Sequence, residues 1–252
     1  MSDTIKIAIV TGSSRGIGRS IALALAQEGQ DVIVTYRSNT QEAENVVKAI
    51  QGVGRKAVAL QQDVGDTSSF DASVEQIRAA LKDNWGRETF DYLVNNAGIG
   101  ITKPFAALTE DDFDAMANVH IKGVVFLTQK LLPLMNDGGG IVNISSGLTR
   151  VTAPAAGGYA MMKGAVEVYT RHLAAEVGPR GITVNAVAPG PTATDFGGGL
   201  MKDENVQVGM GQMSVFGEIG TPDNIGSTVA AVLSGGMHRV TAQRIEVGGF
   251  SV

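Results

Sequence analysis

The sequence T-G-S-S-R-G-I-G, residues Thr11–Gly18, is the most informative turn of this 252-residue chain. It follows a short apolar run, Ile5–Val10, and opens a helix-like segment that continues I-A-L-A-L-A-Q-E-G. Glycines permit a tight turn and a close approach of backbone to phosphate, and a helix N-terminus offers free N–H groups to such an anion. The spacing is G-x-x-x-G-x-G rather than the general G-x-G-x-x-G, and glycines also serve ordinary strand-to-helix turns. Its place directly after the first strand predicts a dinucleotide-binding turn.

Short β-branched runs alternate with longer helix-like segments along the chain. The expected strands are Ile5–Val10, Val32–Thr35, Ala57–Gln61, Tyr92–Val94, Ile141–Ile144, Thr183–Ala188 and Arg244–Val247. The expected helices lie near 17–28, 41–52, 68–83, 111–134, 159–177 and 222–233. Runs that are apolar throughout are typical of strands buried on both faces of a parallel sheet. The alternation predicts an α/β fold with a doubly wound parallel sheet of seven strands and helices on both faces.

The sequence contains no internal repeat and no linker rich in proline, serine or charge, so residues 1–252 are expected to form a single domain. Segment 191–215 differs from the rest, because it contains three consecutive glycines and three scattered methionines. This composition is typical of a flexible loop with adaptable apolar side chains. We predict a mobile substrate loop here, in which Phe196 and Met201 help to set the substrate range.

The composition narrows the class of protein. The chain carries 20 basic and 25 acidic residues, a net charge of −5, so no basic surface for nucleic acid is expected. It has no cysteine, which excludes disulfides and zinc–thiolate sites, and no metal site is expected. The N-terminus M-S-D-T-I-K-I-A-I-V does not resemble a signal peptide, and no run of roughly 18 or more apolar residues suggests a membrane span. We therefore expect a soluble, cytoplasmic protein.

The end of the second expected strand bears on which nicotinamide cofactor is bound. A carboxylate at this position binds the ribose of NAD, but the sequence D-V-I-V-T-Y-R-S carries Tyr36 and Arg37 there. Arg37, together with Arg15 inside the glycine turn, suits a ribose 2′-phosphate through charge-assisted hydrogen bonds. Two solvated surface arginines are the alternative interpretation. The pattern favours NADPH/NADP over NADH/NAD.

Three further motifs follow the glycine turn in order: N-N-A-G (Asn95–Gly98), Y-A-M-M-K (Tyr159–Lys163) and N-A-V-A-P-G (Asn185–Gly190). With them the chain resembles the short-chain dehydrogenase/reductase family, especially its 3-oxoacyl-ACP-reductase-like branch, from the first strand to the final V-G-G-F. The resemblance implies a Rossmann-like single domain, hydride transfer with a nicotinamide cofactor, and a homotetramer. It also implies these cofactor-binding residues: Gly12, Ser14, Arg15, Gly16, Ile17, Gly18, Arg37, Asp63, Val64, Asn96, Ala97, Gly98, Tyr159, Lys163, Pro189, Gly190, Thr192 and Thr194.

The Y-A-M-M-K sequence places a tyrosine and a lysine four residues apart in an expected helix. Residues i and i+4 lie on one helix face, with Cβ atoms roughly 5–6 Å apart. A nearby ammonium favours the phenolate and lowers the tyrosine pKa from its usual value of about 10, which would make Tyr159 a workable general acid/base. The resemblance adds that Lys163 holds the nicotinamide ribose. An ordinary amphipathic helix with the tyrosine at its buried edge is the alternative.

A serine completes the candidate catalytic set. Ser146 follows the fifth expected strand, at the edge of the sheet where ligands bind in open α/β folds, and lies 13 residues before Tyr159, the usual interval in the family. Its hydroxyl would hydrogen-bond a substrate carbonyl and stabilise the developing oxyanion. The alternative is Ser145, which we expect to point to the other side of the strand.

The family carries a fourth residue, an asparagine, in a pattern like N-V-x-G-x-F. This chain has A-N-V-H-I-K-G-V-V-F-L-T-Q, and alignment on Gly123 and F-L-T-Q places His120 at that position. Retaining Asn118 instead would require a two-residue insertion inside a helix. Histidine both donates and accepts hydrogen bonds and titrates at about 6.5 in model peptides. We predict that His120 carries the proton relay and that its protonation affects turnover near neutral pH; the alternative is that it only fills space.

The combined hypothesis is an NADPH-dependent reductase of a small-molecule ketone or carbonyl substrate, reversible as an alcohol dehydrogenase. Tyr159 would donate the proton, Ser146 would orient the carbonyl, Lys163 would tune Tyr159, and His120 would connect the site to solvent. Two alternatives are a cofactor-binding protein that has lost turnover and a non-redox lyase or isomerase on the same scaffold.

Overall fold

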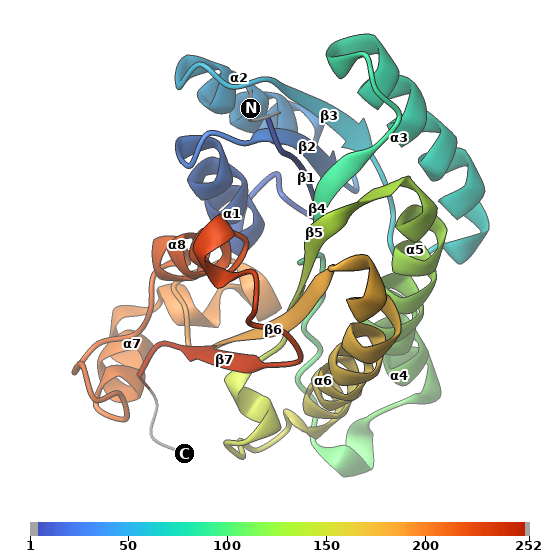
Figure 1. The fold of residues 1–252 in the computed structure, drawn as a ribbon. Helices are drawn as coiled ribbons and strands as arrows, with labels where there is room; N and C mark the ends of the chain where they lie inside the picture. Colours follow the sequence, from blue (N-terminus) through green and yellow to red (C-terminus); the bar gives the residue numbers. More distant parts are fainter. Residues whose placement is uncertain (1–4, 250–252) are drawn as a thin grey trace.

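The computed structural model describes residues 5–249, in which seven parallel strands form one sheet between two layers of helices (Figure 1). The strands are β1 (Ile7–Val10), β2 (Asp31–Tyr36), β3 (Ala57–Gln61), β4 (Phe90–Asn95), β5 (Met135–Ile144), β6 (Thr183–Pro189) and β7 (Arg244–Val247). Their order across the sheet is β3-β2-β1-β4-β5-β6-β7. The predicted doubly wound sheet is confirmed. Strand β5 begins earlier than its apolar run, because an irregular register beside β4 lets the preceding glycine-rich stretch join the sheet.

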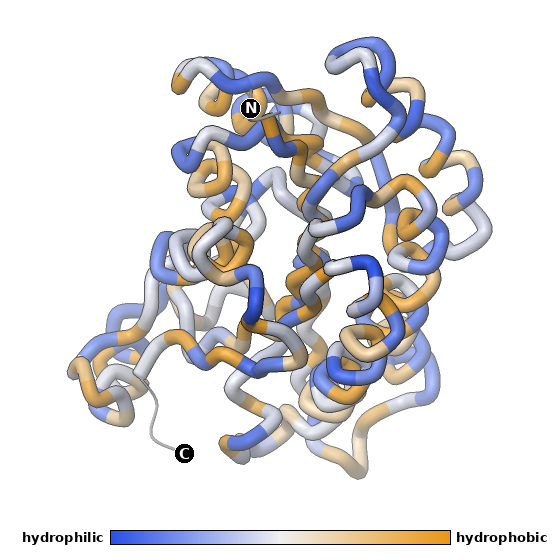
Figure 2. Tube along the Cα trace, in the orientation of Figure 1, coloured by the Kyte–Doolittle hydropathy of each residue, from blue (hydrophilic) through white to orange (hydrophobic). Residues whose placement is uncertain are grey.

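Helices pack on both faces of the sheet. One layer consists of α1 (Gly16–Gln27), α2 (Thr40–Gly52) and α8 (Pro222–Val232), and the other of α3 (Phe70–Trp85), α5 (Gly123–Leu131) and α6 (Gly157–Val177). Successive strand residues point to opposite layers, so Ala8 and Val10 join one hydrophobic core while Ile7 and Ile9 join the other. This is why β1 is apolar throughout. Figure 2 shows the hydrophobic segments gathered inside, with hydrophilic ones along the outer turns of α2 and α3.

The helix expected near 111–134 is interrupted. It consists of α4 (Glu110–Ala117), a π-helical turn at Asn118–Lys122, and α5, which ends at Leu131. A π-helical turn widens the helix by one residue per turn and is frequent at functional sites. The interruption places His120 in the wide turn, where its side chain is buried.

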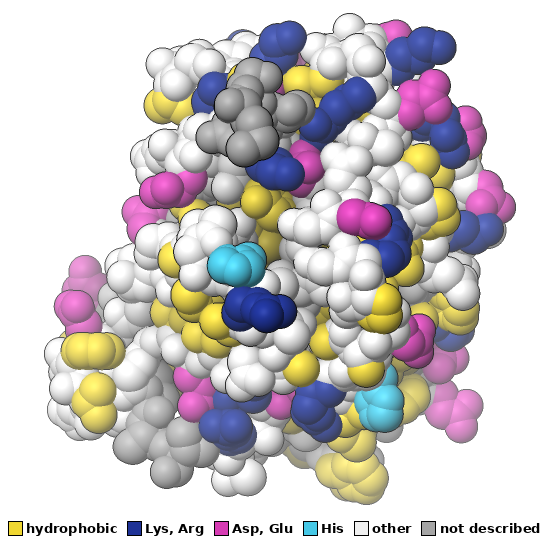
Figure 3. Space-filling model, viewed as in Figure 1, with side chains coloured by type: hydrophobic (Ala, Val, Ile, Leu, Met, Phe, Trp, Pro, Cys, Tyr) yellow, Lys and Arg dark blue, Asp and Glu magenta, His cyan; other side chains and the backbone are white. Residues whose placement is uncertain are grey.

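The segment 191–215 contains more regular structure than the predicted loop. Helix α7 (Glu204–Gly211) begins at Asp203, whose carboxylate accepts hydrogen bonds from the backbone N–H groups of Asn205 and Val206. Aspartate is a favoured N-cap residue, but the nearby glycines led to the prediction of a loop over this helix. Figure 3 shows hydrophobic side chains on the surface over α7, where Val208 is exposed. The predicted mobility of the segment stays a prediction.

The direction of strand addition reverses between β1 and β4. At such a point the connections leave the sheet on opposite faces, so a crevice opens at the carboxyl ends of the two strands. The glycine turn follows β1 and the N-A-G segment follows β4, so both motifs border this crevice. Within residues 5–249, no helix combines the length and the apolarity that crossing a membrane requires. The expected cytoplasmic location stays a prediction.

Candidate active site

Hydrogen bonds join the glycine turn after β1 to the segment after β4. The hydroxyl oxygen of Thr11 accepts from the backbone N–H groups of Asn96 and Ala97 at 2.9 and 3.0 Å. In return, the side-chain amide of Asn96 donates to the carbonyl oxygens of Thr11 and Gly12 at 2.8 and 3.1 Å. Two motifs that are far apart in the sequence therefore form one continuous floor to the crevice.

Three glycines of this floor are required by close packing. A Cβ atom on Gly12, whose φ is +62°, would lie 2.9 Å from the backbone of the N-A-G segment, and one on Gly18 would lie 2.4 Å from the side-chain nitrogen of Asn96. A Cβ atom on Gly98 would lie 2.8 Å from the ring of His120. The sequence predicted these glycines for cofactor contact, and the structure adds that they let the turn, the N-A-G segment and the π-helical turn approach one another.

The other residues expected to bind the cofactor surround this floor. Thr194, in the segment after β6, lies beside the glycine turn, with its methyl carbon 3.9 Å from where a Cβ atom on Gly16 would be. Arg15 in that turn and Arg37 after β2 are exposed. The remaining members lie in the glycine turn or at and beyond the carboxyl ends of β3, β4 and β6: Ser14, Ile17, Asp63, Val64, Ala97, Pro189, Gly190 and Thr192.

Gln62 is a candidate site residue that the sequence interpretation missed. It follows β3 beside Asp63 and is buried, 6% exposed. Neither its side-chain oxygen nor its side-chain nitrogen has a hydrogen-bond partner among the described residues. A buried amide without partners costs free energy, so its presence at the cofactor edge of the sheet fits a polar ligand group. A glutamine next to a strand end gives no signal of this in the sequence, because its burial depends on the neighbouring strands.

Tyr159 and Lys163 lie on one face of α6, next to the end of β5. Lys163 is 4% exposed, and its Nζ donates to the carbonyl oxygen of Ile144 at 2.7 Å. The same nitrogen lies 5.7 Å from the centre of the Tyr159 ring. The Ser146 hydroxyl lies near enough to the Tyr159 phenol to lower its pKa, and its oxygen accepts the backbone N–H of Leu148 at 3.2 Å. The three residues predicted as a catalytic set are therefore brought together.

Burial dominates the electrostatics of this set. It raises the pKa of the Tyr159 phenol above its usual range, because the phenolate would lose hydration, and the nearby Ser146 hydroxyl opposes this. Burial also lowers the pKa of Lys163 to about 7. Burial therefore outweighs the neighbouring Lys163, and the prediction of a lowered Tyr159 pKa is wrong for the protein's own side chains. Tyr159 holds its proton at neutral pH.

His120 is fully buried and packs edge-on against Tyr159, with ring centres 5.3 Å apart. Its Nε2 lies 2.7 Å from the carbonyl oxygen of Ile99 and 3.3 Å from the Ile99 backbone nitrogen, and the shorter contact with the carbonyl oxygen favours a ring proton on Nε2. Nδ1 is then an acceptor, without a partner among the described residues. Burial, and secondly the charge of Lys163, lowers the pKa of His120 to about 3. The predicted titration near neutral pH is wrong, because the imidazole stays neutral well below that range.

Phe196, in the segment after β6, packs against Tyr159 with ring centres 5.6 Å apart. The Phe196 ring also lies close to Gly100, where an added Cβ atom would be 2.8 Å from it. An apolar side chain of the predicted substrate segment thus lies directly beside the candidate proton donor.

Comparison with known proteins identifies the family. The family model described as enoyl-(acyl carrier protein) reductase matches residues 12–251. The chain is 37% identical over 246 residues to the 3-oxoacyl-[acyl-carrier-protein] reductase FabG of Staphylococcus aureus, covering 97% of each chain. It is 34% identical over 259 residues to the hydroxynaphthalene reductase-like protein Arp2 of Metarhizium brunneum, covering 98% of this chain and 95% of the relative. The chain belongs to the short-chain dehydrogenase/reductase family.

Two solved structures extend this result. The angucycline C-6 ketoreductase LanV with bound NADP has a TM-score of 0.91 and 38% identity, with 96% of this chain and 93% of LanV covered. A short-chain dehydrogenase from Burkholderia cenocepacia in complex with NADP has a TM-score of 0.88 and 35% identity, with 97% of each chain covered. For this member of the short-chain dehydrogenase/reductase family, oxidoreductase is therefore the general class of activity, as the sequence motifs predicted.

The buried Lys163 leads to a prediction about stability. Because the folded pKa is about 7 and the unfolded pKa about 10.5, the unfolded chain binds more protons between these values, so the cost of burying the ammonium is complete below pH 7 and fades as pH rises to about 10. Lys163→Met should raise Tm near pH 6 by roughly 4–8 °C, the change that about 2 kcal/mol produces in a chain of this size. The gain should vanish near pH 10.

Thermal unfolding followed by circular dichroism across this pH range measures the effect. Lys48→Met on α2 is the matched control, because this lysine is exposed, and it should leave Tm unchanged. A lower Tm for Lys163→Met than for the parent near pH 6 would show that the hydrogen bond to Ile144 outweighs the burial cost.

Proposed function

We propose that this short-chain dehydrogenase/reductase uses NADPH to reduce a small-molecule ketone to an alcohol. The observation that carries the proposal is the group at the end of β5, where the Ser146 hydroxyl lies beside the Tyr159 phenol and Lys163 Nζ lies 5.7 Å from the centre of the phenol ring. The NADP bound to the two solved relatives supports the choice of cofactor. Phe196 beside Tyr159 supports a substrate with an apolar group next to its carbonyl.

The crevice residues fit a dinucleotide phosphate. Helix α1 begins after Arg15 without a side-chain cap, so its first backbone N–H groups are free for a phosphate. The unpartnered amide of Gln62 fits a polar group of the adenosine, and the exposed Arg15 and Arg37 fit a 2′-phosphate through charge-assisted hydrogen bonds.

The chain's own residues supply the proton chemistry. When bound, NADPH provides the hydride for the carbonyl carbon. Ser146 donates its hydroxyl proton in a hydrogen bond to the carbonyl oxygen, which can only accept, while the Ser146 oxygen accepts the N–H of Leu148. Tyr159 then gives its phenol proton to that oxygen, because an alkoxide is a stronger base than a phenolate. The raised pKa of Tyr159 keeps the acid form populated at neutral pH, which favours reduction over alcohol oxidation.

Lys163 and His120 support this transfer. The Lys163 ammonium stabilises the phenolate that remains after Tyr159 has given up its proton. The neutral ring of His120 restricts the position of Tyr159, and its free Nδ1 accepts a hydrogen bond from a water on the path that returns a proton to the site. His120 would thus take the role of the family's asparagine in the proton path by hydrogen bonding, while its own ring stays neutral.

The first test measures NADPH and NADH oxidation at 340 nm with a panel of aliphatic, aromatic and 3-oxoacyl ketones. Turnover with at least one ketone is expected, and Tyr159→Phe should abolish most of it. kcat/KM should favour NADPH by about 10- to 100-fold, the value of one or two charge-assisted hydrogen bonds, and Arg37→Asp should flatten or reverse this ratio. Arg239→Asp, an exposed charge reversal before β7 at the opposite edge of the sheet, is the control. Equal kcat/KM with both cofactors in the parent would contradict the 2′-phosphate assignment.

The second test concerns His120. His120→Asn should retain substantial kcat because it restores a neutral hydrogen-bonding side chain, whereas His120→Ala should lose on the order of 10²-fold. NADPH affinity, followed by fluorescence, should stay the same in both variants. Because burial holds the pKa at about 3, kcat of the parent should show no inflection from this imidazole between about pH 5 and pH 8. A kcat for His120→Ala equal to that of the parent would contradict a role in proton transfer and show that His120 only fills space.

The third test concerns the proposed homotetramer. Helices α5 and α6 expose the apolar side chains of Phe126, Met161 and Val168 on the outside of the molecule. We expect these helices to contact a second subunit, so Val168→Glu should lower the mass measured by light scattering at micromolar concentration. Val53→Glu, at an exposed valine directly after α2, should leave the mass unchanged. A monomeric parent would contradict the assembly.

A further inference from the structure

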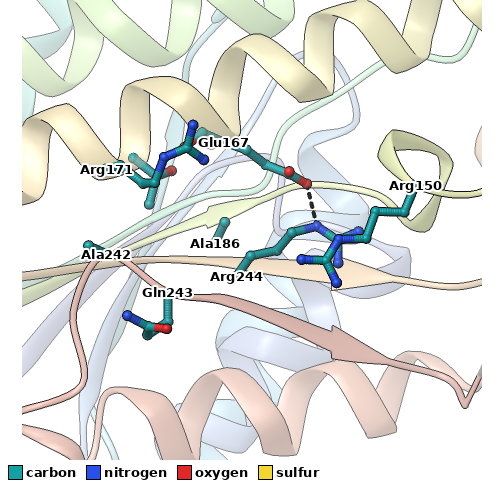
Figure 4. Close-up of a pocket in the computed structure, with 8 residues that line it drawn as sticks. Arg150, Glu167, Arg171, Ala186, Ala242, Gln243 and Arg244 are labelled. Carbon is teal, nitrogen blue, oxygen red and sulfur yellow. Dashed lines mark hydrogen bonds and ion pairs between the residues drawn. The ribbon is translucent and has the colours of Figure 1, made fainter. Parts of the chain in front are cut away.

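An ion-paired cluster lies between α6 and β7, next to the turn that carries Ser146. Glu167 of α6 and Arg244 of β7 both line a cavity of about 200 Å³. Figure 4 shows their side chains pointing toward each other. Oxygen Oε1 of Glu167 accepts hydrogen bonds from Arg244 Nε at 2.6 Å, Ser145 Oγ at 2.5 Å and Thr149 Oγ1 at 2.8 Å. A single carboxylate oxygen therefore connects the helix, the edge strand and the turn that carries Ser146.

Arg244 reaches the residue that bears the candidate catalytic hydroxyl. Its side chain is 9% exposed, and its Nη2 donates to the carbonyl oxygen of Ser146 at 3.2 Å and to Thr149 Oγ1 at 3.0 Å. Its Nη1 lies 2.6 Å from a carboxylate oxygen of Glu246. The guanidinium thus holds the backbone of Ser146 directly, while the carboxylates of Glu167 and Glu246 hold the guanidinium.

The contacts continue along one face of α6. Tyr159, Lys163 and Glu167 are spaced four residues apart, so they project from the same side of the helix. Lys163 donates a hydrogen bond to the carbonyl oxygen of Ile144, the last residue of β5. Glu167 accepts a hydrogen bond from the hydroxyl of Ser145, the residue that follows Ile144. The helix that carries the proton donor is therefore bonded, residue by residue, to the turn that presents the Ser146 hydroxyl.

The Glu167–Arg244 ion pair fixes the position of the turn more than it stabilises the fold. An ion pair at this depth loses hydration, and such pairs contribute little net stability. Here the two charged groups form hydrogen bonds with Ser145, Ser146 and Thr149. These bonds fix where the turn lies relative to α6. A displacement of about 1 Å at a catalytic group can cost on the order of 10²-fold in rate.

We propose that Glu167 and Arg244 are positioning residues that hold the Ser146 hydroxyl in hydrogen-bond reach of Tyr159 and of the substrate carbonyl. The inference rests on the proposed ketone reduction. Ser145, an alternative to Ser146 in the sequence, is then part of the support, because its hydroxyl donates to Glu167.

The experiment compares Glu167→Gln and Arg244→Met with Arg171→Gln. Arg171 lines the same cavity, but among the described residues its side chain bonds only the backbone carbonyl of Glu167, so its variant is the matched control. In the first two variants kcat should fall on the order of tenfold, while NADPH affinity and the Arg171→Gln kcat stay at the parent level. The same loss should disappear when Ser146 is already alanine, because the pair acts through that hydroxyl. An equal loss in the Ser146→Ala background would overturn the proposal.

Hydrogen exchange gives a readout that is independent of turnover. The backbone N–H of Leu148 donates to Ser146 Oγ, so its exchange should quicken in Glu167→Gln and stay unchanged in Arg171→Gln. Unchanged exchange overturns the positioning role, whereas faster exchange in a protein that reduces no ketone would support it and reject the proposed function instead. If Glu167→Gln does not fold, Thr149→Val removes one hydroxyl of the same cluster, and it should give the same loss of kcat and the same dependence on Ser146.

Discussion

A buried ammonium connects the two elements on which the site depends. Lys163 Nζ donates to the carbonyl oxygen of Ile144 at 2.7 Å, and this bond fastens α6 to the end of β5. Because Tyr159 lies one helical turn earlier and Ser146 two residues beyond Ile144, their relative position follows from this attachment. The attachment has an electrostatic cost, since burial disfavours the charge of Lys163, and a protein selected only for stability would gain by an apolar side chain here.

The same burial gives the site a consistent protonation pattern. Tyr159 keeps its proton, His120 stays neutral, and Lys163 titrates at about 7, so at neutral pH Lys163 changes charge most readily of the three. A low-dielectric site opposes every charged form unless a partner stabilises it. The π-helical turn contributes by directing His120 inward against Tyr159 rather than toward solvent. Charge that develops on the substrate oxygen would therefore meet fixed dipoles and one cation, with little competing charge from the protein.

Much of the fold and part of the site could be predicted because they depend on local patterns. Apolar strands and intervening helices specify a doubly wound parallel sheet, and parallel strands bring their carboxyl ends to one edge. The glycine turn, the N-A-G segment, Ser146 and Tyr159 all follow or face such ends, so their proximity was predictable. The position of His120 was predicted by alignment on Gly123, which follows three residues later, but the π-helical turn that directs its ring inward was not.

The sequence by itself thus determined the doubly wound parallel sheet and the groups at the carboxyl ends of its strands, because residue type and spacing control these features. Only the tertiary structure decided the protonation states of these groups and the contacts that hold them in position. The pKa values of Tyr159, Lys163 and His120 depend on how much water each side chain loses, which no local pattern records. The Glu167–Arg244 pair joins residues 77 positions apart, and Gln62 is buried by neighbours from other strands. Such contacts exist only once the sheet has closed against its helices, because each needs partners that the chain supplies from distant segments.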